Sequence, residues 1–299
     1  MAALQPSTVA SYGPAFKRWW RYCAANNKSP FRPTRDQLLH FFTQEFNSNL
    51  AYSSLNCSRA AVSLITNAAF SDDPSVSRFF RGCAKLRPPA PKYQATWDPQ
   101  PVLRYLQASP NTDLSLAALS QKLLMLLALA TGHRLQTFAK ITLDNIKVGQ
   151  ESVVIKIPAW IKTSAIGRCQ PLLTLPFFSD ATICPAATLS EYLWRTEAMR
   201  GSVQNLFIAL KPPARPVGQQ TLARWVRYTL SASGVDPAFS AHSTRHAATS
   251  AARRGGASLV AIFRSAGWTL SSSAFARFYE RPLAESPAEF ANAVFQVAQ

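Results

Sequence analysis

The chain has 299 residues, of which 47% are hydrophobic, and this composition predicts a globular protein with a sizeable core rather than a disordered one. Its formal net charge of +17, from 32 Lys and Arg against 15 Asp and Glu, predicts a polyanionic partner, nucleic acid before an anionic membrane surface. The apolar run at residues 123–130 is far shorter than the ~20 residues of a membrane span, and the N-terminus lacks a secretory pattern, so we expect an intracellular protein.

The cysteine and histidine patterns do not favour a metal or disulfide framework. The five cysteines are odd in number, widely spread and never spaced as C-x-x-C, which predicts free or buried thiols. The four histidines show no metal-ligand spacing, and the acidic residues form no cluster suited to a two-metal nuclease. We therefore expect neither a metal nor a cofactor.

Residues 1–86 show helical periodicity interrupted by turn signals, which predicts a bundle of about four helices. The expected helices cover residues 8–25, a stretch beginning at residues 33–36, and residues 52–69 and 74–85. Because Lys and Arg outnumber Asp and Glu by more than two to one here, we predict a DNA-binding domain. The residues predicted to contact DNA are Lys17, Arg18, Arg21, Arg59, Arg81 and Lys85, with Arg87, Lys92 and Arg168 further along the chain.

Five prolines in residues 87–101 exclude a continuous helix, so this basic segment is predicted to be an extended linker. Residues 102–285 then form a second domain. Helices are expected at residues 101–108, 114–131, 188–197 and 221–233, and strands at 152–157 and 171–176 with a turn at 163–168. The expected fold class is mainly α with a small antiparallel β-sheet, preceded by the helical DNA-binding domain.

A last helix is expected at residues 286–299. Ser286 and Glu289 form a capping-box start, and Phe290, Val294 and Val297 make an apolar stripe. The stripe predicts docking either into a neighbouring protomer or onto the chain's own second domain.

Side chains able to bind a phosphate occur in short motifs of the second domain. Arg134 follows an apolar helix and a Thr-Gly pair, where a basic side chain is costly unless it meets an anion or a carboxylate. His242 and Arg245 are three residues apart at the start of a helix, so both can face one side at an end that favours anions. The neighbouring His246 is expected to be structural. Taken singly, Arg134 is better explained as a capping or salt-bridged arginine.

Lys162 and Trp268 can each likewise be explained by a functional or by an ordinary structural role. Lys162 lies at the tip of the predicted hairpin, where a solvated lysine is ordinary, although a loop can also carry an amine to a scissile phosphate. Lys156 and Arg168 are nearby substitutes for it. Trp268 offers an indole N–H that donates without proton transfer, with a core tryptophan as the alternative.

Tyr279 lies in the motif Phe275-Ala-Arg-Phe-Tyr279 and is either a nucleophile or an ordinary half-buried tyrosine. A nucleophilic tyrosine must lose a proton from a group of pKa ~10, which requires nearby positive charge and a base. Two guanidiniums, an amine, an imidazole, an indole and a phenol suit phosphoryl transfer from DNA to a tyrosine, because Arg presents a planar fork of donors to two phosphate oxygens.

The order of these motifs resembles the tyrosine recombinase (phage integrase) family. The order is Arg, Lys on a hairpin, His-x-x-Arg, Gly-Trp and Tyr, and the resemblance covers residues 98–282, with residues 1–86 resembling more loosely the helical, SAM-like core-binding domain. Within the family, the motifs around Lys162, Arg245 and Tyr279 are most similar to the recombinases of eukaryotic DIRS and Ngaro retrotransposons.

The resemblance implies a mechanism and its site residues. Tyr279 attacks a DNA phosphate to give a 3′-phosphotyrosine and a free 5′-hydroxyl, and a second strand's hydroxyl reverses the step without metal or ATP. Arg134 and Arg245 hold the non-bridging oxygens, Lys162 protonates the leaving oxygen, His242 acts as base or phosphate donor, and Trp268 donates a hydrogen bond. A tetramer on double-stranded DNA, with the terminal helix in trans, and a nuclear location are also implied.

Three positions depart from the family pattern. Thr137 stands where an acidic residue is common, Asn145 stands where aspartate is common, and Trp268 replaces the commoner histidine and lies eleven residues before Tyr279 instead of about nine. Support for Arg134 is therefore expected from elsewhere, and the loop before Tyr279 is expected to be longer.

Three alternatives remain at the level of the sequence. A type IB topoisomerase-like enzyme would nick and reseal DNA without strand exchange. A recombinase-derived protein that only binds DNA would not need the complete catalytic set. Electrostatic binding to membrane or RNA would account for the charge but not for the order of the motifs.

Overall fold

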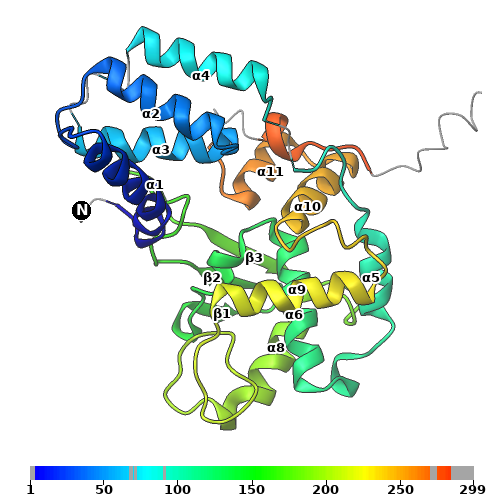
Figure 1. Cartoon of the computed structure of the whole chain (residues 1–299). Helices are drawn as coiled ribbons and strands as arrows, with labels where there is room; N and C mark the ends of the chain where they lie inside the picture. Colours follow the sequence, from blue (N-terminus) through cyan, green and yellow to red (C-terminus); the bar gives the residue numbers. More distant parts are fainter. Residues whose placement is uncertain (1–3, 67–69, 71–72, 90–91, 270–274, 284–299) are drawn as a thin grey trace, which may run out of the picture. The chain divides into compact units, whose positions relative to one another are not determined.

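The computed structural model describes residues 4–283 except 67–69, 71–72, 90–91 and 270–274. The chain divides into two compact units, Met1–Lys92 and Tyr93–Gln299 (Figure 1). The predicted helix at residues 286–299 lies outside the described residues.

Helices make up the first unit. They are α1 (Pro6–Ala25), α2 (Arg35–Asn47), α3 (Tyr52–Ile65) and α4 (Pro74–Leu86). Thr34 and Gln37 form a capping box at the start of α2. Asp73 caps α4, whose first residue is a proline. The core is rich in aromatic side chains, with Trp19 against Phe41 and Phe42 against Phe80.

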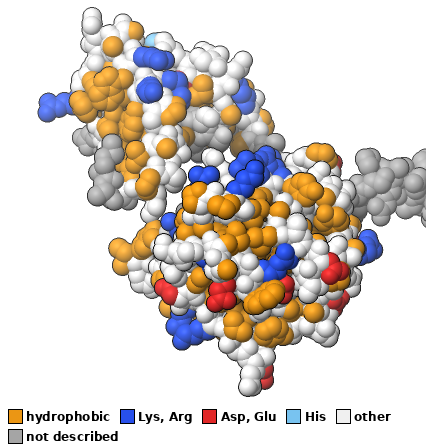
Figure 2. All heavy atoms as spheres, turned by 90° about the horizontal axis from the view of Figure 1, so that it is seen from below, with side chains coloured by type: hydrophobic (Ala, Val, Ile, Leu, Met, Phe, Trp, Pro, Cys, Tyr) orange, Lys and Arg blue, Asp and Glu red, His pale blue; other side chains and the backbone are white. Residues whose placement is uncertain are grey.

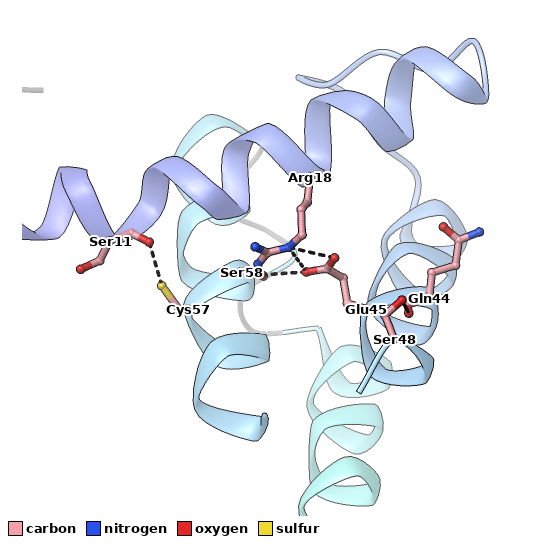
Figure 3. Close-up of polar contacts among 7 residues, drawn as sticks. All are labelled: Ser11, Arg18, Gln44, Glu45, Ser48, Cys57 and Ser58. Carbon is pink, nitrogen blue, oxygen red and sulfur yellow. Dashed lines mark hydrogen bonds and ion pairs between the residues drawn. The ribbon is translucent and has the colours of Figure 1, made fainter. Parts of the chain in front are cut away.

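A partly buried ion pair connects three of these helices. Arg18 of α1 donates from Nε to both carboxylate oxygens of Glu45 on α2, at 3.0 and 2.7 Å, and its Nη2 reaches Ser58 of α3 at 2.9 Å (Figure 3). Ser58 also donates to Glu45. The Nε and Nη2 groups of Arg18 therefore have partners inside the unit.

The second unit is mainly helical with one small sheet, as predicted from the sequence. Its main elements are α5 (Pro99–Gln107), α6 (Leu116–Thr131), α7 (Leu135–Phe138), β1 (Ile146–Val148), β2 (Ser152–Lys156), β3 (Leu172–Pro176), α8 (Pro185–Thr196), α9 (Gln219–Ala232), α10 (Ser243–Arg254), α11 (Leu259–Ala266) and a π-helical turn at Phe275–Tyr279. Short 3₁₀ turns occupy Asn111–Asp113, Leu143–Asn145 and Glu197–Met199.

The core of this unit is built around α6. Because α6 is apolar on nearly every side, it is buried among α8, α9 and α10. The sheet has the antiparallel order β1-β2-β3, with Val153 opposite Leu175 and Ile155 opposite Leu173, and these four side chains face the core. α6 therefore ends at the core, and residues 132–134 follow directly from its buried C-terminal end.

The chain enters the second unit through residues 93–97, which are tied to two distant segments. The amide of Thr96 donates to the carbonyl of Pro282 at 2.8 Å, and Thr96 and Leu283 form a parallel bridge. Two side-chain bonds, each of 2.8 Å, run toward the start of α10, from Tyr93 to Ser240 and from Trp97 to Ser243.

Candidate active site

Arg245 lies at the first turn of α10 and is 2% exposed. Its Nη1 donates to the carbonyl of Gly132 and its Nη2 to that of Ala266, and its guanidinium lies 4.1 Å from the centre of the Trp268 ring. Burial first, and then the charge of Arg134, lower the pKa of Arg245 to about 10, while its interaction with Tyr279 opposes that shift. The guanidinium is still charged at neutral pH.

Tyr279 ends the π-helical turn and is buried beside α10. Its ring stacks on His246 with centroids 4.5 Å apart, and its hydroxyl lies 3.4 Å from Nε2 of His242. Ser250 of α10 holds the segment by donating to the carbonyl of Tyr279 at 2.6 Å. The phenol is therefore fixed next to an imidazole, and the guanidinium of Arg245 lies 5.1 Å from its ring.

Two donors in this cluster are buried without a partner among the described residues. These are Nε of Arg245 and the indole Nε1 of Trp268, whose ring lies 4.9 Å from that of Tyr279. Buried donors without partners are uncommon, so each of them points to a missing acceptor. A phosphate oxygen would supply one.

Arg134 emerges where α6 ends. Gly132 ends α6 in the left-handed conformation, at φ 62°. Arg134 is the N-cap residue of α7. Within the described residues, the side chain of Arg134 has neither a hydrogen bond nor an ion pair, and it is partly exposed. Its charge acts on both His133 and Arg245. Arg134 is thus available to an anion beside Arg245.

His133 belongs to the same cluster but was not predicted as a site residue. It is 6% exposed and lies next to Thr137, with its Nδ1 3.5 Å from the hydroxyl oxygen. Its position in Thr131-Gly-His-Arg134, directly before a predicted catalytic arginine, was the available sequence signal.

Lys162 lies on an exposed part of the loop between β2 and β3, and no contact of its amine with the other site residues is found within the described part of the chain. The loop itself does reach the cluster. Arg168 donates to the carbonyl of Gly267 at 3.0 Å, and the hydroxyl of Thr163 would lie 3.8 Å from a Cβ placed on Gly267. The structure thus gathers five predicted catalytic residues and leaves the sixth on an adjoining loop.

The residues predicted to contact DNA fall into two groups. Four already have partners: Arg18 as described, Arg59 with Phe80, Arg87 with Phe46 and Leu50, and Arg168 with Gly267. Five are exposed, namely Lys17, Arg21, Arg81, Lys85 and Lys92, and of these Lys92 also interacts with another group. In the view of Figure 2, basic side chains are visible on each of the two units, and acidic side chains are visible mainly on the larger unit. DNA contact by any of them stays a prediction.

Nothing in the described part of the chain indicates a metal centre or a membrane span. No three His, Cys, Asp or Glu side chains lie close enough there to hold a metal ion. None of the described helices has the length and apolar composition to cross a bilayer.

The profile of the phage integrase family matches residues 98–285. Among solved structures, the XerH site-specific recombinase bound to difH substrate, a pre-cleavage complex, is similar, with 14% identity, a TM-score of 0.60 and coverage of 96% of this chain and 78% of that one. A lambda integrase(75-356) dimer bound to a COC′ core site has 14% identity, a TM-score of 0.55 and coverage of 96% and 94%. A lambda integrase tetramer bound to a Holliday junction has 12% identity, a TM-score of 0.54 and coverage of 96% and 76%. These structures confirm the predicted fold. No curated protein matches the sequence.

Proposed function

The chain belongs to the phage integrase family, and from that premise we propose that it cleaves and rejoins DNA strands with Tyr279 as the nucleophile. The phenol oxygen forms a bond to phosphorus as the bond to the 5′-oxygen breaks, leaving a 3′-phosphotyrosine. His242 takes the phenol proton, and Lys162 gives one to the departing 5′-oxygen. A 5′-hydroxyl from another strand reverses the step.

One observation carries the proposal. The hydroxyl of Tyr279 lies 3.4 Å from an imidazole nitrogen, inside a cluster that also holds Arg245 and the unpartnered donor of Trp268. Arg134 and Arg245 would bind the non-bridging oxygens and stabilise the charge that builds in the transition state. Arg245 and Trp268 already lie beside Tyr279, which supports electrostatic stabilisation of the transition state by these donors.

We expect wild-type protein, but not Tyr279→Phe, to form a denaturation-resistant adduct with nicked suicide duplexes that carry the source element's terminal repeats, in the absence of metal. The adduct should hold the DNA through its 3′-phosphate, because the 5′-oxygen is the leaving group. It should accumulate because the nick lets the fragment with the 5′-hydroxyl diffuse away. Tight duplex binding without an adduct would instead indicate a protein that only binds DNA. Resealing without joining of two duplexes would indicate a topoisomerase-like enzyme.

The partners proposed are double-stranded DNA and further copies of the chain, assembled as a tetramer. The similar lambda integrase structure is a tetramer bound to a Holliday junction, which supports this. Residues 286–299 would dock into a neighbouring protomer through their apolar stripe. A variant that lacks residues 286–299 should therefore form smaller DNA complexes, and unchanged tetramers with full recombination would rule out the docking.

The biological setting proposed is a mobile element of the DIRS or Ngaro type, whose DNA is integrated in the nucleus. The sequence motifs around Lys162, Arg245 and Tyr279 support this part of the proposal.

A further inference from the structure

His133 is the one buried histidine among the four, all of which lie in the described residues. Its ring connects three segments. Nδ1 faces the hydroxyl of Thr137 on α7 at 3.5 Å, another hydrogen bond reaches the backbone of Ser265 on α11, and a Cβ on Gly267 would lie 3.1 Å from Cε1. The imidazole thus fills the space between the end of α6 and the end of α11.

The charge state of this imidazole follows from its surroundings. Burial first, then the charges of Arg245 and Arg134, lower the pKa of His133 to about 3, although the bond to Ser265 opposes this. At neutral pH the ring is uncharged, so one nitrogen donates and the other accepts. Arg168, bonded to the carbonyl of Gly267, adds a third positive charge nearby.

Within the described residues, no carboxylate pairs with Arg134 or Arg245. Ion pairs such as Arg18–Glu45 and Arg253–Glu280 lie elsewhere. Thr137, at the position where a carboxylate could stand, faces His133 instead. Both guanidiniums therefore keep their full charge for an incoming phosphate, and neutral groups must hold them in place.

The position of Arg245 depends on the segments that His133 joins. Its guanidinium donates to the carbonyls of Gly132 and Ala266. Gly132 directly precedes His133, and Ala266 directly precedes Gly267, where an added Cβ would meet the ring of His133. A change in the packing of His133 against Gly267 would move both carbonyls, and with them the guanidinium.

We propose that His133 is a positioning residue that, as a neutral imidazole, keeps Arg134, Arg245 and Trp268 aligned on the scissile phosphate. This inference rests on the proposed strand cleavage. His133 touches neither the substrate nor the reacting atoms, and it acts through the arginines.

The test compares His133→Leu and His133→Asn with wild-type protein in single-turnover cleavage of the suicide duplex. Leu removes both hydrogen bonds and should slow cleavage about 10- to 100-fold, because small misplacements of a phosphate-binding group are that costly. Asn keeps a neutral donor and acceptor and should recover most of the rate. The dissociation constant for duplex DNA should change less than about threefold, since many phosphate contacts set affinity. His40→Asn, an exposed histidine of the first unit, is the matched control.

A second measurement does not depend on cleavage. In NMR spectra, the ring signals of His133 should not titrate between pH ~5 and ~8, whereas an ordinary histidine titrates there. Addition of inorganic phosphate should shift the Nε signal of Arg245 in wild-type protein and less in His133→Leu. If His133→Leu does not fold, Thr137→Val replaces it, because Val removes the hydroxyl that faces Nδ1 but keeps the shape.

The results separate the role of His133 from the proposed strand cleavage. If His133→Leu folds and cleaves like wild type, or if His133→Asn is as slow as His133→Leu, the inference is overturned. An adduct missing from the wild type would count against the proposed function, and the phosphate titration would then decide on His133 alone. A ring that is protonated near pH ~6 would also overturn the inference.

Discussion

At the scale of single residues, Lys122 is a buried charge that the proposed chemistry does not use. It lies on α6, is 2% exposed, and its amine donates to the carbonyl of Ser109 at 2.7 Å. Burial lowers the pKa of Lys122 to about 8, although Asp180 opposes the shift. Keeping the amine charged in this place opposes folding.

Lys122→Met should be more stable than wild type at neutral pH by about 1–3 kcal/mol, because it removes an ionised group from the core. The folded-state pKa of about 8 lies below the reference value of 10.5, so across that window the unfolded chain holds more protons. The free energy of unfolding of the wild type therefore rises between pH 8 and 10.5 as Lys122 loses its proton. The difference in this free energy between Lys122→Met and the wild type should shrink over the same range.

Urea unfolding of both proteins across this pH range measures the difference. Lys211→Met, at an exposed lysine, controls for the loss of one positive charge. A variant less stable than wild type at neutral pH would show that the amine contributes more than its burial costs.

At the scale of elements, the pair Arg18–Glu45 with Ser58 fastens α1, α2 and α3 (Figure 3). Glu45→Gln leaves the guanidinium without its counter-charge in a mostly buried position, and should lower the free energy of unfolding by about 1–3 kcal/mol. Asp36→Asn, which breaks an exposed pair with Arg35, should cost at most about 0.5 kcal/mol. Denaturant unfolding of the full chain, followed by circular dichroism, compares them. Equal effects would show that the buried pair is no stronger than the surface one.

The long helices of both units were predictable, because apolar periodicity and strong caps mark them. α4 and α6 are examples, with Asp73 and Ser115 as caps. β1 and α7 were not predicted, since three- and four-residue elements carry too little pattern. The first turn of α5 lies inside the segment predicted as linker, because Asp98 caps a helix that has a proline in its first turn.

Some residues of the site could likewise be predicted from the sequence, and others could not. Arg245, Trp268 and Tyr279 were predictable from their order in the chain, and the structure brings them together. His133 was not, because its role depends on Ser265 and Gly267, which lie more than 130 residues away in the sequence. The pairing of Arg18 with Glu45 was also not predictable, since an arginine at a helix surface looks the same whether or not a carboxylate meets it.

At the scale of the whole molecule, the net charge of +17 should dominate DNA affinity. With roughly 6–10 phosphates neutralised, the logarithm of the binding constant should fall with the logarithm of salt concentration with a slope of about −5 to −9. Tyr279→Phe should keep this slope, because a phenol hydroxyl adds no charge. Lys17→Gln, at an exposed site, should reduce the slope by about 1.

Fluorescence anisotropy across a salt series measures these slopes, with Lys211→Gln as an exposed control on the second unit. A slope for Lys17→Gln equal to that of wild type would show that this residue is not in contact with phosphate. Affinity independent of salt would contradict an electrostatic interface altogether.

The bond between Thr96 and Pro282 has a mechanical consequence. The chain passes from the first unit into residues 93–97, and that short strap is bonded on one side to Pro282, three residues after Tyr279, and on the other to Ser240 and Ser243, which flank His242. Residues 93–97 are therefore bonded both to the segment that carries Tyr279 and to the residues that flank His242. If the first unit binds DNA as proposed, a load on that unit would reach the segments of Tyr279 and His242 through residues 93–97.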